Sequence, residues 1–121
     1  MSEPTLRYTK KEGVALVTFD RPKVLNAMNQ QFWIDLQNTL AEAETDDTVK
    51  AVVFTGEGRA FSAGADLKES KTRSFEDYRA YLESLQEASR MIILYPKPTI
   101  AAINGYALGS GYELEIGRAH V

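Results

Sequence analysis

Three short apolar runs alternate along this chain with two segments of helical periodicity. The apolar runs span residues 14–19, 49–55 and 99–103, and the helical segments span 30–45 and 75–94. Each run is short and partly β-branched, as expected of a buried strand. A strand–helix–strand alternation predicts a largely parallel sheet with helical cover, because the helix carries the chain back to the same end of the sheet. The sequence therefore predicts an α/β fold.

The ends of these segments carry local signals. Residues 6–10 are expected to pair with the first apolar run through a turn at 11–13, and Asn29 is placed to cap the first helix. Apolar residues at three- and four-residue spacings define one face of each helix. In the first helix they are Phe32, Trp33, Leu36, Leu40 and Ala43; in the second they are Tyr78, Tyr81, Leu82, Leu85, Ala88, Met91 and Ile92.

Composition excludes several classes of protein. The chain has 121 residues, a formal net charge of −3, and no cysteine, which excludes disulfide scaffolds and thiol nucleophiles. No basic surplus points to a nucleic acid or an anionic membrane partner. No apolar stretch approaches the roughly 18 residues of a membrane helix, and the start carries no apolar signal segment. A cytoplasmic protein is the expectation.

Two glycine-bearing loops, 57–66 and 103–111, follow the second and third apolar runs. They therefore lie at carboxyl ends of predicted strands, where α/β sheets bind ligands. If helices begin near Leu67 and Ser110, unpaired N–H groups are available there. Two such donors aimed at one point would form an oxyanion hole. The other interpretation is a pair of tight turns without catalytic function, and neither loop has the spacing of a nucleotide phosphate loop.

Glu113 stands close to the start of the last predicted helix, two residues after Gly111. A glutamate there can simply complement the positive end of the helix dipole. It can also serve as a general acid or base beside the second loop. The residues alone leave both interpretations open.

Three ordered segments resemble the crotonase family, that is, the enoyl-CoA hydratases and isomerases. The segments are Arg21-Pro22-Lys23-Val24-Leu25-Asn26-Ala27, then residues 58–67 (GRAFSAGADL), then residues 97–114 (KPTIAAINGYALGSGYEL). Their order and the helices between them are more specific than any single segment. The resemblance implies the N-terminal half of a crotonase-type ββα spiral fold.

The resemblance also implies a site. The thioester carbonyl of an acyl-CoA would be held by the N–H groups of Ala65 and Ser110, and Glu113 would be the first of two catalytic glutamates. Coenzyme A would be part of the substrate, with no metal or further cofactor. For the intact protein the resemblance implies a homotrimer or a dimer of trimers. The implied coenzyme A contacts are Lys23, Val24, Leu25, Ala63 and Lys68.

The implied reaction is hydration of a 2-enoyl-CoA. The second hydratase glutamate would fall beyond residue 121, so an isomerase or another acyl-CoA enzyme stays open, and the chain by itself is expected to be inactive. A non-catalytic coenzyme A-binding or oligomer-forming paralogue is a further alternative. The presence of Glu113 argues against it, because a protein without catalysis does not need this carboxylate. Ser110 departs from the family, which usually has glycine there.

The end of the chain departs further. Residues 1–114 are expected to form part of one crotonase domain, whereas residues 115–121 (EIGRAHV) abandon the family pattern and spell the translation of a widely used sequencing adapter. We interpret them as a non-native tail, in which His120 is incidental.

This interpretation predicts that the source locus continues after the codon for Leu114 with an alanine-rich helix. Re-amplifying and sequencing the locus checks it. A genuine stop codon after Val121 would contradict it.

Overall fold

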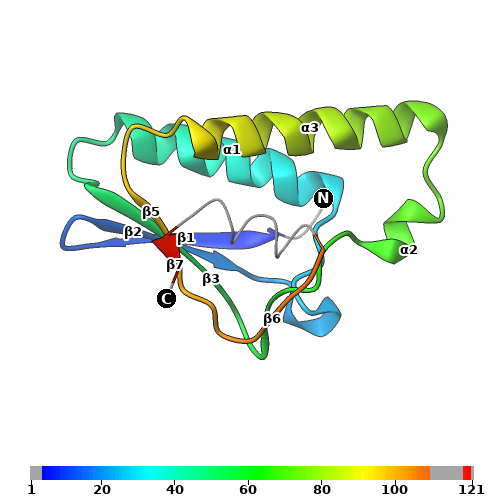
Figure 1. Ribbon diagram of the computed structural model, residues 1–121, viewed down its shortest axis with the longest axis horizontal. Helices are drawn as coiled ribbons and strands as arrows, with labels where there is room; N and C mark the ends of the chain where they lie inside the picture. Colours follow the sequence, from blue (N-terminus) through cyan, green and yellow to red (C-terminus); the bar gives the residue numbers. More distant parts are fainter. Residues whose placement is uncertain (1–3, 110–118, 121) are drawn as a thin grey trace.

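The computed structural model describes residues 4–109 and the backbone of Ala119 and His120. In this part of the chain, five strands form one sheet in the order β1-β2-β3-β5-β7, and β4 pairs with β6 separately (Figure 1). The strands are β1 Leu6–Lys11, β2 Val14–Phe19, β3 Ala51–Gly56, β4 Ala60–Ser62, β5 Thr99–Ala101, β6 Tyr106–Ala107 and β7 Ala119–His120. The helices are η1 Pro22–Val24, α1 Gln30–Thr45, α2 Leu67–Ser70 and α3 Phe75–Ile93.

The predicted parallel sheet is confirmed. β2 pairs with β3 and β3 with β5 in parallel, and α1 and α3 are the respective crossover helices. β1 is antiparallel to β2 across a hairpin whose turn residues, Glu12 and Gly13, have φ of 51° and 84°. Two left-handed turn residues match the right-handed twist of the flanking strands, which is why the hairpin closes so tightly.

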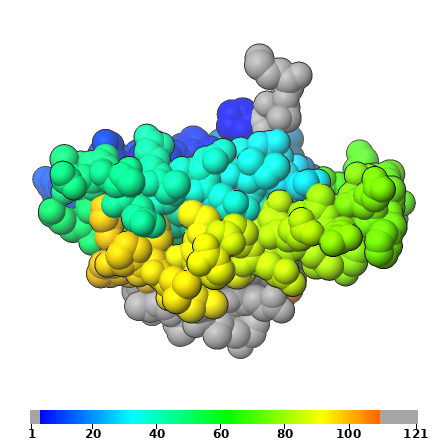
Figure 2. Space-filling model, turned by 90° about the horizontal axis from the view of Figure 1, so that it is seen from above, coloured from blue at the N-terminus to red at the C-terminus, as the bar shows by residue number. Residues whose placement is uncertain are grey.

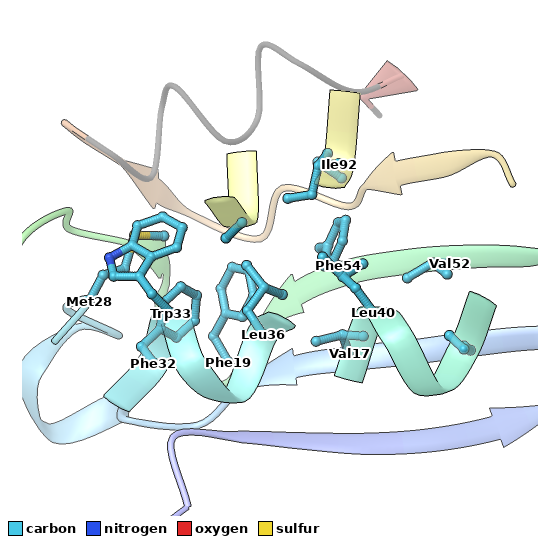
Figure 3. Packing of buried hydrophobic residues seen from close by; sticks show 14 of the residues in the cluster. Val17, Phe19, Met28, Phe32, Trp33, Leu36, Leu40, Val52, Phe54 and Ile92 are labelled. Atoms are coloured by element: carbon cyan, nitrogen blue, oxygen red, sulfur yellow. The ribbon is translucent and has the colours of Figure 1, made fainter. Parts of the chain in front are cut away.

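Both long helices lie on the same face of the sheet, side by side (Figures 1 and 2). Alternate strand residues point toward them, as the two-residue period of a strand requires. Figure 3 shows these side chains packed between α1 and the strands. The largest fully buried members of this core are Trp33, Phe19, Phe32, Phe54, Phe61, Met28, Leu36, Leu40, Val17, Val49 and Val52.

The helix predictions are confirmed with one correction. Asn29 caps α1 by accepting the Phe32 N–H at 2.8 Å, and the predicted apolar face of α1 is buried. On α3, Tyr81, Ala88 and Ile92 are buried as expected, but Tyr78 is 50% exposed. Tyr78 lies in the first turn of α3, and this end of the helix extends beyond the start of α1 (Figure 1).

The two predicted loops contain structure that the sequence does not signal. Residues 57–66 include β4, and residues 103–111 include β6. The third apolar run ends as a strand at Ala101, and the helix expected from Leu67 is only four residues long. Strands of two or three residues are too short to show a period-two pattern. Neither α1 nor α3 has an apolar stretch that could span a lipid bilayer, and the shorter helices between residues 4 and 109 have none either.

The core predicts a contrast between two neighbours on α1. Leu36 is fully buried, whereas Ile34 is 37% exposed. Leu36→Ala should lower the free energy of unfolding by about 2–5 kcal/mol, because it leaves a cavity in a close-packed core. Ile34→Ala, the matched control, should cost clearly less. Urea denaturation measures both, and equal losses would contradict this account of the core.

Candidate active site

The pairing of β4 with β6 brings the two glycine-bearing loops together. The strands are parallel, with Ala60 opposite Tyr106 and Ser62 opposite Ala107, and the Leu108 N–H donates to the Ser62 carbonyl at 2.9 Å. Parallel strands leave a sheet at the same edge, so both loops emerge side by side. A Cβ placed on Gly109 would lie 3.7 Å from the Gly64 Cα. Ser110 and Glu113 lie outside the described residues.

Asn104 ties the second loop to the first. Its Nδ2 donates to the carbonyls of Gly58 (2.8 Å) and Ala60 (3.2 Å), and its Oδ1 accepts the Gly56 N–H at 3.0 Å. The next residue, Gly105, packs so closely that an added Cβ would overlap the Arg59 carbonyl. Glycine is required at this position for close approach, not for turn conformation.

One backbone N–H of the first loop, that of Ala65, is not used to hold the loop. Met28 forms an isolated parallel bridge with Ala65: the Met28 N–H donates to the Gly64 carbonyl (2.8 Å) and the Asp66 N–H donates to the Met28 carbonyl (3.2 Å). In this parallel bridge Met28 bonds to Gly64 and Asp66, the residues on either side of Ala65, and not to Ala65 itself. The N–H of Ala65 therefore points away from Met28, and it donates to no acceptor within residues 4–109.

The other loop amides are occupied in holding the loop. The Ala63 N–H donates to the Leu25 carbonyl at 2.9 Å, and the Gly64 N–H donates to Ser62 Oγ at 3.1 Å. The Ser62 hydroxyl is fully buried and donates in turn to the Asn26 carbonyl at 2.7 Å. Three of the four N–H groups from residue 63 to 66 thus fix the loop, and the Ala65 N–H is the one that has no acceptor among residues 4–109.

Asn26 fixes the segment on which this loop rests. It is 1% exposed and has φ of 56°. Its Oδ1 accepts the Arg21 N–H at 2.8 Å, and its Nδ2 donates to the carbonyls of Glu57 (3.0 Å) and Ala60 (2.8 Å). Asparagine tolerates the left-handed region better than most residues, and Leu25 before it has φ of 54°. The hydrogen bonds offset the backbone strain of this left-handed pair.

The predicted coenzyme A contacts lie on adjoining segments. Lys23 and Val24 are exposed in η1, and Leu25, which follows them, is bonded through its carbonyl to Ala63. Lys68 is exposed in α2, three residues after Ala65.

A surface cavity of about 780 Å³ adjoins this region, and Lys23 and Val24 line it. Arg7 and Arg21 also line it but are already paired with carboxylates. Lys23 makes no ion pair within residues 4–109 and is therefore the basic residue of this wall that remains available to an anion.

A set of contacts holds α2 against the long helices. The Glu69 carboxylate accepts the Gln30 N–H at the start of α1 (3.1 Å) and pairs with Arg73 at 2.9 Å. The Arg73 guanidinium lies 3.7 Å from the centre of the Tyr81 ring on α3, a cation–π contact. The Tyr81 hydroxyl donates to the Met28 carbonyl at 3.3 Å. The helix that carries Lys68 is therefore fixed to the segment that orients Ala65.

Asp66 is the charged residue that directly follows Ala65. Its carboxylate accepts the Glu69 N–H at 3.1 Å and pairs with Arg21 Nη1 at 3.1 Å. Partial burial opposes ionisation, but these hydrogen bonds outweigh it and lower the pKa of Asp66. Within residues 4–109 no cluster of three histidine, aspartate or glutamate side chains is arranged to hold a metal ion.

A sequence model of the enoyl-CoA hydratase/isomerase family matches residues 9–117. The short-chain-enoyl-CoA hydratase of Clostridium acetobutylicum is 42% identical over 107 residues, or 87% of this chain and 41% of the relative. The 2,3-dehydroadipyl-CoA hydratase of Escherichia coli is 39% identical over 120 residues, or 96% of this chain and 44% of the relative.

Solved structures agree. The crystal structure of the enoyl-CoA hydratase from Bacillus anthracis superimposes with a TM-score of 0.89 at 32% identity, over 94% of this chain and 45% of that one. The chain belongs to the enoyl-CoA hydratase/isomerase family, and the predicted crotonase fold is confirmed. It spans less than half the length of these relatives.

The lowered pKa of Asp66 predicts an acid-dependent loss of stability. A carboxylate whose pKa is lowered by folding stabilises the fold above the ordinary value of about 4, and this contribution disappears as pH falls through the folded-state pKa. Asp66→Asn, which can still cap α2, should therefore lower the Tm at pH 7, and its Tm should converge with that of the unmodified protein in acid.

Thermal unfolding between pH 7 and 2 measures the two curves. Glu12→Gln, at an exposed turn carboxylate without an ion pair in the described region, is the matched control and should run parallel to the unmodified protein. Parallel curves for Asp66→Asn would contradict the prediction.

Proposed function

We propose that the full-length protein is a hydratase that adds water across the α,β double bond of 2-enoyl-CoA thioesters. The observation that carries the proposal is the Ala65 N–H, which points away from Met28 and lies on a loop that the β4–β6 pairing holds beside the second loop. Two backbone donors converging on one thioester oxygen would stabilise the enolate that forms when water attacks. The sequence similarity to two enoyl-CoA hydratases supports the same reaction.

In this proposal the donors are the N–H groups of Ala65 and Ser110, and the Glu113 carboxylate holds the water and takes part in the proton transfers. The water oxygen bonds to C3 of the acyl chain as the water gives a proton to a carboxylate. The π pair of the C2–C3 bond becomes the C1–C2 double bond of an enolate, and the carbonyl π pair moves onto the thioester oxygen. When the carbonyl re-forms, C2 takes a proton from a carboxylic acid. A second carboxylate, from outside residues 1–121, completes the proton transfers. The enolate charge is held by backbone N–H groups, so the chemistry requires no metal ion.

Coenzyme A would bind along η1 and α2. Lys23 and Lys68 are exposed cations suited to its phosphates. Leu25 and Ala63, joined by a hydrogen bond from the Ala63 N–H to the Leu25 carbonyl, would contribute further contacts. Val24, 46% exposed, adds apolar contact for the adenine or the pantetheine arm.

The proposal predicts that Glu113→Gln in the full-length protein lowers kcat for hydration of a short enoyl-CoA by at least about 100-fold. The amide keeps the size of the side chain but cannot transfer a proton. The affinity for an acyl-CoA should change little, because the proposed coenzyme A contacts lie elsewhere. Steady-state hydration and acyl-CoA binding are measured in parallel.

Ser110→Gly is the matched control, because it keeps the backbone donor and removes only a side chain. It should retain or raise kcat. Near-normal turnover in Glu113→Gln would exclude a two-glutamate hydratase and favour another chemistry of the same family.

A further inference from the structure

Arg21 lies outside the proposed substrate contacts, yet its side chain joins the two chain segments that define the Ala65 donor. Nη1 of Arg21 donates to the Ala27 carbonyl at 2.6 Å and to the Asp66 carboxylate at 3.1 Å. The Arg21 and Asp66 side chains are 22% and 14% exposed. A charge-assisted bond in such a half-buried place is stronger than the same bond in open solvent.

The two acceptors flank the bridge on opposite sides. Ala27 directly precedes Met28, and Asp66 directly follows Ala65. The peptide whose carbonyl binds Arg21 is the same peptide whose N–H binds Gly64. Arg21 therefore closes a ring of hydrogen bonds around the Met28–Ala65 bridge.

The backbone of Arg21 is itself held in place. Its N–H donates to the Asn26 side chain at 2.8 Å, and its carbonyl accepts the Asn26 N–H at 2.9 Å. Pro22 follows and restricts the chain further. The Arg21 backbone is therefore fixed. Through its bonds to Ala27 and Asp66, the guanidinium restricts the position of Ala65.

We propose that Arg21 is a positioning residue of the oxyanion site: by joining the Ala27 carbonyl to the Asp66 carboxylate, it fixes the bridge that directs the Ala65 N–H. The inference rests on the proposed function. A backbone donor cannot be re-aimed by its own side chain, so its direction depends on the register of its neighbours. A displacement of about 1 Å at a reacting centre can cost on the order of 100-fold in rate.

The test uses the full-length protein with Arg21→Met, Arg21→Lys and a matched control, Arg7→Met. Arg7 lines the same cavity but pairs with Asp20 and Glu57 at the surface, so the control removes the same charge without touching the bridge. For Arg21→Met we expect kcat to fall by about 10- to 100-fold with KM for the enoyl-CoA within about twofold. Arg21→Lys should be intermediate, since an ammonium keeps the charge but, on its flexible stem, does not fix the direction of its donors as the planar guanidinium does. Arg7→Met should match the unmodified enzyme.

Amide hydrogen exchange provides a readout that does not depend on activity. Arg21→Met should accelerate exchange at the Met28 and Asp66 amides, which form the bridge, and Arg7→Met should not. The double variant Arg21→Met/Asp66→Asn should have a higher Tm than Arg21→Met, because it no longer contains an unpaired carboxylate. Its kcat should stay as low as that of Arg21→Met, because the link between the Ala27 carbonyl and the side chain at position 66 is still missing. A purely structural role would restore both Tm and kcat.

The outcomes separate the two hypotheses. An unmodified enzyme that hydrates enoyl-CoA, with unchanged kcat in Arg21→Met, overturns the role of Arg21 and leaves the proposed function standing. An unmodified enzyme without hydration overturns the proposed function, and exchange at Met28 and Asp66 still decides whether Arg21 fixes the bridge. If Arg21→Met does not fold, Arg21→Lys decides, and a kcat equal to that of the unmodified enzyme overturns the inference.

Discussion

The parallel pairing of β4 with β6 is the interaction on which the candidate site depends. These strands are three and two residues long, so they cannot hold together by their own ladder bonds alone. Asn104 supplies three further hydrogen bonds across the same junction, and the close approach at Gly105 excludes any side chain there. Two loops whose paired residues lie more than forty positions apart in the sequence therefore leave the fold side by side.

Where the donors of a candidate site are main-chain N–H groups, the important side chains are those that fix the direction of the backbone. The Ala65 side chain is a single methyl group, and the direction of its N–H is decided by residues that need not touch a substrate. Asn26 and Ser62 are fully or almost fully buried, and each bonds to backbone groups of the segments that carry the loop. Polar burial of this kind is costly unless every group is paired, and here the paired groups specify a single backbone geometry.

The local features of the fold can be predicted from the sequence, whereas the long-range pairs cannot. The bounds of α1 and its Asn29 cap follow from a 3.6-residue period and a capping side chain within one short window. That both loops lie at carboxyl ends of strands follows from the parallel topology. The Arg21–Asp66 pair joins residues 45 positions apart, and no local pattern distinguishes it from an exposed pair. The four-residue α2 and the exposure of Tyr78 likewise depend on which neighbours the finished fold provides.

The bonds of Asn104 also bear on the chemical lifetime of the protein. An asparagine directly before a glycine is the context in which the side-chain amide most readily loses ammonia, because the unhindered backbone nitrogen that follows can attack it. In this chain the attack requires the Asn104 side chain to rotate away from Gly56, Gly58 and Ala60, to which it is bonded. The resulting carboxylate would face two carbonyl oxygens where the amide had donated to both. Deamidation of Asn104 would thus weaken the contact between the two loops. The hydrogen bonds of Asn104 that hold the loops together also slow this deamidation.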